Sequence, residues 1–258
     1  MWIFGRLTNS AEKILRWNGS WHPVPAPPDD AADSPIVFSP TDAWAIGTQH
    51  GTSAGSCTST TLWNWTGGPK WIAHTVGFCA TGLGGTWAKD VWAVGTQTLP
   101  ATRARISAAY WNGTHWKAIT MPHPYTYDWL PQVVVGSIKN VWLTGDNKNS
   151  VHPAQPGRGW ALHWNGSSWH QTPASVLDAS PGVALVGSDL WMGPDQEWTG
   201  AWLNRTPDAA LFGPPSAGGV HPGLLAIAAI PGSSSIWGAG YLKGGSDGPL
   251  IAAFGSVP

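Results

Sequence analysis

Side-chain amides recur at one position of a repeated motif, and they are the most regular candidates for chemistry in this chain. Gln49, Gln97, Asn147 and Gln196 each stand five residues after a tryptophan. An amide donates and accepts hydrogen bonds without carrying charge, so a ring of amides could hold the hydroxyl groups of a neutral polar ligand. The alternative interpretation is that each amide caps the exposed end of a strand.

Tryptophans outside the repeated positions are a second set of candidates. Trp129, Trp160 and Trp198 fall in or beside long loops, where an exposed indole could stack on a pyranose ring or simply pin its own loop. His50 and Tyr127 belong to the same loops. The predicted ligand site therefore consists of these aromatic and amide residues: Gln49, His50, Gln97, Tyr127, Trp129, Asn147, Trp160, Gln196 and Trp198.

Catalytic chemistry is one alternative, and a protein-interaction scaffold is another. Asp128, Asp195 and Glu197 are carboxylates that a hydrolase or lyase could use on the same loops, with a histidine as acid or base. The sequence has no G-x-S-x-G elbow, and its nine histidines and two cysteines show no H-x-x-x-H or C-x-x-C spacing. We therefore expect a binding protein rather than an enzyme, with no metal and no cofactor.

The elements that must position these residues are repeats built on tryptophan. The first landmark is Trp2, Trp44, Trp92, Trp142, Trp191 and Trp237, in segments such as DAWAIG and DVWAVG, with spacings of 42, 48, 50, 49 and 46 residues. The second landmark is Trp17, Trp65, Trp111, Trp164, Trp202 and Phe254, and the third is Trp21, Trp71, Trp116 and Trp169. Recurrence at one position of every unit is typical of a packing layer. Periods of this length without a helical pattern predict an all-β fold, a β-propeller of four-stranded antiparallel blades.

Each unit divides into four strands, shown best by residues 132–136, 141–145, 160–164 and the strand that starts at Trp169. Short turns with Asp or Asn-Gly join strands one and two and strands three and four. The connections at 48–58, 96–105 and 146–159 are long and dissimilar, so the face that carries them is the predicted site. The count favours six blades, with five or seven left open. We expect one domain over residues 1–258, whose first unit begins at its second strand and whose last unit ends after its third.

The amino-acid composition limits the classes of partner that this protein is expected to bind. Charged residues make up 10% of the chain and the formal net charge is -1, so a nucleic-acid partner is not expected. No apolar run is long enough for a membrane helix. A neutral polar small molecule or a glycan is the expected partner, and the oligomeric state is left open. The sequence carries no secretory signal, yet its low charge suits a secreted or extracytoplasmic protein. Cys57 and Cys79 fit a disulfide and two buried thiols equally well.

Two charged groups are predicted to face solvent. Arg103 and Arg105 alternate along a strand, which is typical of a solvated strand face. Asp29, Asp30 and Asp33 form an acidic linker between two units.

At DVWAVG and HWNGSSW the sequence resembles bacterial tryptophan-rich β-propeller repeats, which are related in pattern to kelch and galactose-oxidase-type propellers. The WNGxxW rhythm is similar to that of sugar-binding propeller lectins of the tectonin and Photorhabdus-lectin kind. The likeness covers nearly the whole chain, and the lectin likeness implies sugars bound between or above blades. The double-Gly and Tyr signature of kelch blades is absent, and no Tyr, His and Cys copper set can be matched, so oxidase chemistry is not implied.

Overall fold

A computed structural model describes the chain at residues 1–6, 12–29, 31–51, 57–99, 103–122, 132–147, 158–171, 183–192, 196–198, 203–205, 221–229, 236–243 and 248–254. The regular secondary structure within these ranges is β-strand throughout, which confirms the predicted all-β fold. No helix that could cross a bilayer is found in the same ranges.

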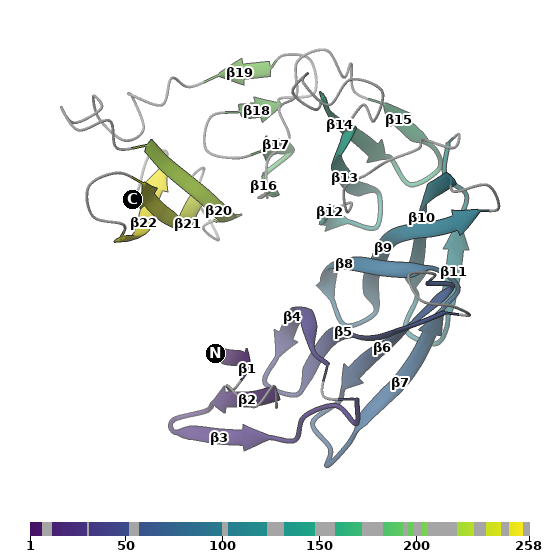
Figure 1. Cartoon of the computed structure of the whole chain (residues 1–258), viewed down its shortest axis with the longest axis vertical. Helices are drawn as coiled ribbons and strands as arrows, with labels where there is room; N and C mark the ends of the chain where they lie inside the picture. The colour runs from purple at the N-terminus through teal and green to yellow at the C-terminus, as the bar shows by residue number, and fades with distance from the viewer. Residues whose placement is uncertain are drawn as a thin grey trace. The chain divides into compact units, whose positions relative to one another are not determined.

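The described strands form six sheets, which we number in chain order (Figure 1). Sheet 1 is β1 (Trp2–Arg6), β2 (Glu12–Trp17) and β3 (Trp21–Val24). Sheet 2 is β4 (Asp33–Ser39), β5 (Asp42–His50), β6 (Ser59–Trp65) and β7 (Trp71–Val76). Sheet 3 is β8 (Cys79–Trp87), β9 (Asp90–Leu99), β10 (Arg103–Trp111) and β11 (Trp116–Ile119).

Sheet 4 is β12 (Gln132–Ser137), β13 (Asn140–Asn147), β14 (Arg158–Trp164) and β15 (Trp169–Gln171). Sheet 5 is β16 (Val183–Val186), β17 (Asp189–Met192), β18 (Gln196–Trp198) and β19 (Leu203–Arg205). Sheet 6 is β20 (His221–Ala229), β21 (Ile236–Lys243) and β22 (Gly248–Phe254). In every sheet the strands are neighbours in chain order, as the four-strand unit predicts.

Strand contacts divide the chain into two compact units, Met1–Ile138 and Lys139–Pro258. The first unit contains sheets 1 to 3, and the second contains sheets 5 and 6. The single domain over residues 1–258 and the count of six blades in one closed ring stay predictions.

The second landmark ends the third strand in sheets 2, 3, 4 and 6, and the register shows it. Trp65 pairs with Ala43, Trp111 pairs with Val91, and Phe254 pairs with Ile236. In each case the partner is the residue just before a first-landmark tryptophan. At the start of the chain the Trp17 N–H donates to the Met1 carbonyl at 2.8 Å, so sheet 1 begins at the second-strand position, as predicted.

Sheet 5 corrects one assignment. Trp198 pairs with Leu190, which precedes the first-landmark residue Trp191, so Trp198 and not Trp202 holds the second-landmark position. Trp198 also pairs with Leu203, as Trp164 pairs with Trp169 in sheet 4. The sequence prediction failed here because the link before β18 is short, so the third strand comes early.

The Asn-Gly turns close the outer hairpins as expected. In the turn after β10, Asn112 Oδ1 accepts the backbone N–H groups of Thr114 and His115, both at 3.0 Å. Gly113 takes a φ of 95°, a left-handed conformation that favours glycine. The turn after β14 repeats this geometry, with Gly166 at a φ of 96°. The WNGxxW motif therefore builds a hairpin.

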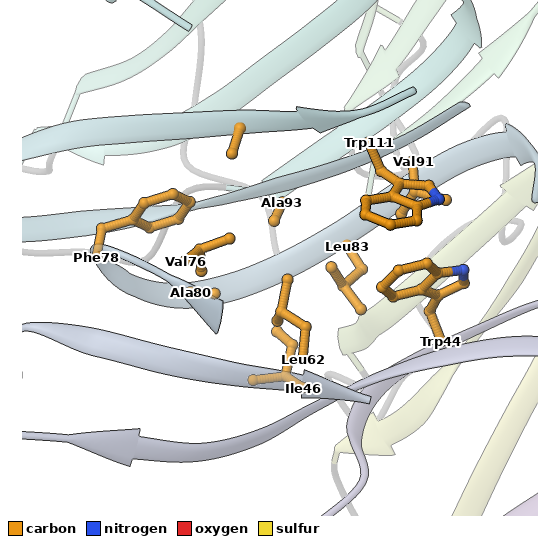
Figure 2. Packing of buried hydrophobic residues seen from close by; sticks show 11 residues of the cluster. Trp44, Ile46, Leu62, Val76, Phe78, Ala80, Leu83, Val91, Ala93 and Trp111 are labelled. Carbon is orange, nitrogen blue, oxygen red and sulfur yellow. The ribbon is translucent and has the colours of Figure 1, made fainter. Parts of the chain in front are cut away.

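Tryptophans from consecutive sheets pack on one another in the first unit. The Trp44 ring of β5 lies 5.4 Å from both the Trp111 and the Trp116 rings of sheet 3. Figure 2 shows the Trp44 and Trp111 indoles close together beside Leu83 and Val91. Trp44 is fully buried, and burying one indole is worth about 5 kcal/mol as an upper bound. These landmark tryptophans are the core.

Some landmark tryptophans are not buried. Trp17 and Trp21 in sheet 1 are 41% and 39% exposed, and Trp237 in sheet 6 is 48% exposed. In sheets 2 and 3 the second-landmark and third-landmark tryptophans, which face each other across the outer hairpin, pack against the sheet that precedes theirs along the chain. Trp17 and Trp21 of sheet 1 belong to neither of these two buried clusters.

The acidic linker is not simply solvated. Asp29 Oδ1 accepts the indole N–H of Trp63 at 2.7 Å, and Asp29 Oδ2 accepts the backbone N–H of Thr48 at 2.7 Å. Trp63 is buried, and its ring lies against Gly47. The carboxylate of Asp29 therefore joins the linker before β4 to strands β5 and β6, which corrects the solvent-facing prediction at this residue.

Candidate functional site

A groove of about 670 Å³ runs between the outer strands of sheets 2 and 3, within the first unit. We call it the Arg105 groove. Its size is in the range of pockets that hold small-molecule ligands. It is lined by the end of β7 and the link that follows, by β9 and β10, and by β11 and the residues after it: Thr75, Val76, Gly77, Phe78, Gln97, Arg105, Ile106, Ser107, Ala108, Ala109, Trp116, Ala118, Ile119, Thr120 and Met121.

Most of the lining is apolar, and part of it belongs to the core. Val76, Phe78 and Ile106 are almost completely buried, so they can present only part of their surface to the groove. Trp116 is half-buried, and its ring is held edge-on against Trp44 at 5.4 Å. A ring held in this way can act as a rigid apolar platform, because its orientation does not have to be fixed on binding.

The polar edge of the groove is a pair of side chains on adjacent strands. Gln97 of β9 and Arg105 of β10 are direct register partners. The Arg105 Nε and Nη2 groups donate to Gln97 Oε1 at 3.0 and 2.6 Å. Gln97 Nε2 in turn donates to the Gly77 carbonyl at 3.4 Å. Arg105 is thus oriented by an amide that is itself anchored to the opposite wall.

That wall is the link between β7 and β8, and sheet 2 holds it firmly. The buried Thr60 hydroxyl donates to the Phe78 carbonyl and accepts the Ala80 N–H, both at 2.9 Å. Gln49 Nε2 donates to the Ala80 carbonyl at 3.0 Å. A disulfide joins Cys57 to Cys79, with 5.7 Å between their Cα atoms. The structure therefore decides for the disulfide, and the groove wall is fixed before any ligand arrives.

Among the residues that the structure describes, the groove carries a single formal charge. Arg105 is the one ionisable side chain in this described lining, which contains no carboxylate or histidine. Arg105 makes no ion pair within the described part of the chain, where its hydrogen bonds go to Gln97. A guanidinium has five N–H donors, so three remain for a ligand.

Of the predicted site residues, Gln97 lines the groove. Gln49 lies outside the lining and uses its amide on the Ala80 carbonyl, in keeping with the strand-capping alternative. His50 Nε2 lies 2.8 Å from the Thr61 hydroxyl, also outside the lining. The structure does not bring these three residues together around one ligand position.

The remaining candidate residues lie away from the groove or outside the part of the chain that the structure describes. Trp160 belongs to β14 and is 4% exposed with its ring over Gly145, so a ligand would meet little of it. Asn147, Gln196 and Trp198 have described backbones at the ends of β13 and β18, but their side chains lie outside the description. Tyr127, Trp129 and the alternative acids Asp128 and Asp195 also lie outside the described residues, as does the Glu197 side chain.

Arg105 is the residue that the sequence analysis missed as a site. The predicted 96–105 loop is mostly strand, since β9 runs to Leu99 and β10 begins at Arg103. The two strands pair along this length and place Arg105 opposite Gln97. The alternation of polar and apolar residues from Arg103 to Ser107 was the signal that the second strand of the hairpin began this early.

Comparisons with known proteins support the fold. No protein-family model matches the chain. No curated protein sequence matches it either. The β-propeller domain of the trilobed protease from Pyrococcus furiosus, described as having an open velcro topology, is similar with a TM-score of 0.54 and 8% identity, over 95% of this chain and 79% of that one. That likeness shows the fold alone, a β-propeller.

Two further solved structures are similar at lower scores. One is YCF48 bound to D1 peptide, with a TM-score of 0.49 and 11% identity over 86% of this chain. This chain spans 65% of the length of that structure. The other is a thermostable family-43 glycoside hydrolase, with a TM-score of 0.38 and 10% identity, over 86% of this chain and 88% of that one.

Proposed function

We propose that this protein is a ligand-binding β-propeller and that the Arg105 groove takes a saccharide, in the manner of propeller lectins. The observation that carries the proposal is the anchored Gln97–Arg105 pair at the edge of an apolar groove. Planar polar groups that are already oriented can hydrogen-bond ring hydroxyls with little further loss of entropy. The Trp116 ring and the apolar floor offer a surface for the less polar face of a sugar.

The binding proposal fits the lining better than an enzyme does. Acid–base hydrolysis needs two ionisable groups within reach of one bond, and the part of the lining that the structure describes has no carboxylate or histidine. A hydrolase or lyase that uses Asp128, Asp195 or Glu197 stays the alternative. The groove would become secondary if a substrate were cleaved and the activity were lost on mutation of these acids.

The proposed location is outside the cytoplasm. Disulfides persist mainly in oxidising compartments, and the Cys57–Cys79 bond supports an exported protein. Charged residues make up only 10% of the chain, which supports the proposal that this protein does not bind nucleic acid.

A glycan array with the full chain tests the proposal, followed by calorimetric titration of the best-binding glycan. Ala118→Trp should block the groove, because Ala118 is exposed and lines it, and should weaken binding about 10-fold or more. Ala73→Trp is the matched control, since Ala73 is also exposed on an outer strand but does not line the groove. Binding to no glycan, or equal binding by both variants, would rule out a saccharide site in this groove.

A further inference from the structure

We infer that the saccharide taken by the Arg105 groove is acidic, with a carboxylate that pairs with Arg105. This inference rests on the proposed function and specifies its ligand class. The starting observation is that the groove has a volume of about 670 Å³ and that Arg105 is the one ionisable group among its described lining residues, the others being apolar or neutral polar.

The partner of Arg105 within the protein leaves its charge unbalanced. Gln97 Oε1 is a neutral acceptor that takes hydrogen bonds from both Nε and Nη2 of Arg105. A carboxylate at this position would have neutralised the guanidinium, whereas the amide orients it and keeps the positive charge available. Hydrogen bonds between a guanidinium and a carboxylate are about twice as strong as neutral ones. An acidic ligand therefore gains more from this arrangement than a neutral one.

The free donors suit a carboxylate in number. After the two bonds to Gln97, both N–H groups of Nη1 and one of Nη2 remain. Two of these can contact the two oxygens of one carboxylate, and Arg recognises carboxylates in this two-point way. A hydroxyl, with one oxygen, can use fewer of them.

The anchoring of Gln97 makes the pairing specific. Gln97 Nε2 donates to Gly77, which belongs to the wall that Thr60 and the disulfide hold in place. A flexible exposed arginine gives little net binding energy, because its side-chain entropy is lost on pairing. Here part of that loss has already occurred, so the ion pair contributes to affinity.

The neutral part of the lining favours a sugar around the carboxylate. Thr75, Ser107 and Thr120 supply hydroxyls, and the Trp116 ring supplies an apolar surface. The ligand class that combines ring hydroxyls with one negative charge is a uronate-type saccharide.

The test compares an acid with its own neutral derivative. Methyl galacturonoside, which has one carboxylate, and its methyl ester are titrated calorimetrically into the wild-type protein, together with an N-acetylated dipeptide that has a free C-terminus. We expect the acid to bind about 10-fold more tightly than the ester, and the difference to shrink at high salt. The dipeptide should bind more weakly than either sugar.

Variants then assign the preference to Arg105. Arg105→Gln should bind acid and ester equally, and Arg105→Lys should keep part of the preference. Lys117→Gln is the matched control, a cation on the neighbouring strand β11 outside the lining, and should behave as wild type. A preference that persists in Arg105→Gln, or an ester that binds as tightly as the acid, overturns the inference but leaves a neutral saccharide site. If only the dipeptide binds, the inference and the proposed function both fail.

Discussion

Single side chains join segments that the repeat pattern leaves separate. Asp29 connects the linker before β4 to two strands of sheet 2, through Trp63 and the Thr48 backbone. Thr60 connects β6 to the link before β8 through two backbone groups. Both contacts satisfy buried or half-buried polar groups that would be costly to leave without partners. Neither residue belongs to a recurring motif, so the repeat pattern does not predict these contacts.

At Asp29, removing the carboxylate should destabilise the first unit. Asp29→Ala leaves the Trp63 indole and the Thr48 N–H without their acceptor, which should lower the free energy of unfolding by about 2 kcal/mol in urea titrations. Asp29→Asn keeps one acceptor oxygen and should lose less. A change below about 0.5 kcal/mol in the alanine variant would show that water replaces these bonds at little cost.

Removing the Thr60 hydroxyl should affect ligand binding in the groove as well as stability. Thr60→Val keeps the shape of the side chain but loses both bonds to the wall, and should cost about 1–3 kcal/mol of stability. A looser wall should also weaken saccharide binding. Thr60→Ser keeps the hydroxyl and is the control for both measurements. If Thr60→Val is destabilised while calorimetric binding is unchanged, the wall does not need this anchor.

Strands act here through the tryptophans that they carry. His74 of β7 lies between two of them, with its ring centroid 5.0 Å from Trp44 and 4.6 Å from Trp111. Burial lowers the pKa of His74 from its ordinary value of 6.5, because the charged form is poorly solvated there. Burial, followed by the nearby His170, also lowers the pKa of His163 in β14. Protonation of these imidazoles therefore opposes folding.

The sign of the pH dependence follows. With a pKa below 6.5 in the folded state, His74 contributes its full stability above that pH, and the contribution is lost as pH falls through the lower folded value. We expect the midpoint temperature of thermal unfolding to decrease as the pH is lowered from about 7 to about 5. The decrease should be smaller in His74→Gln. His22→Gln, at an exposed position, is the control. Parallel midpoint curves for wild type and His74→Gln would contradict the prediction.

At the scale of the whole molecule, one covalent bond complements the repeated sheets. The Cys57–Cys79 disulfide spans 22 residues and ties the start of β8 to the chain just before β6, in a segment that also forms the groove wall. It lies in the first unit, Met1–Ile138. The second unit, Lys139–Pro258, has no cysteine.

Removing this disulfide should destabilise the protein substantially. Closing a loop of this length is worth about 3 kcal/mol through the entropy of the unfolded chain. Cys57→Ala with Cys79→Ala should therefore lower the urea midpoint, and reduction of the wild-type protein should reproduce the shift. A thiol assay on the unfolded, unreduced protein should detect no free thiol. Two free thiols in that assay would contradict the bond.

Short-range patterns determined the repeated sheets of this protein. Burial of a large indole at the same strand position and the Asn-Gly turns act locally, so the four-strand unit and most landmark pairings could be predicted from Trp44, Trp92 and their equivalents. The prediction failed at Trp202, where a short link moved the third strand forward to Trp198. A repeated local pattern does not predict how many residues separate two strands.

Tertiary structure alone decided the candidate site. Gln49 and Gln97 hold the same repeat position, yet Gln49 fastens a strand and Gln97 orients Arg105. Both amides donate to backbone carbonyls of residues 77–80, so the difference is the residue opposite each amide on the adjacent strand, which is Thr60 for Gln49 and Arg105 for Gln97. The sequence could propose amides and rings, but only the paired strands β9 and β10 with the anchored wall at Gly77 placed a charged group over an apolar groove.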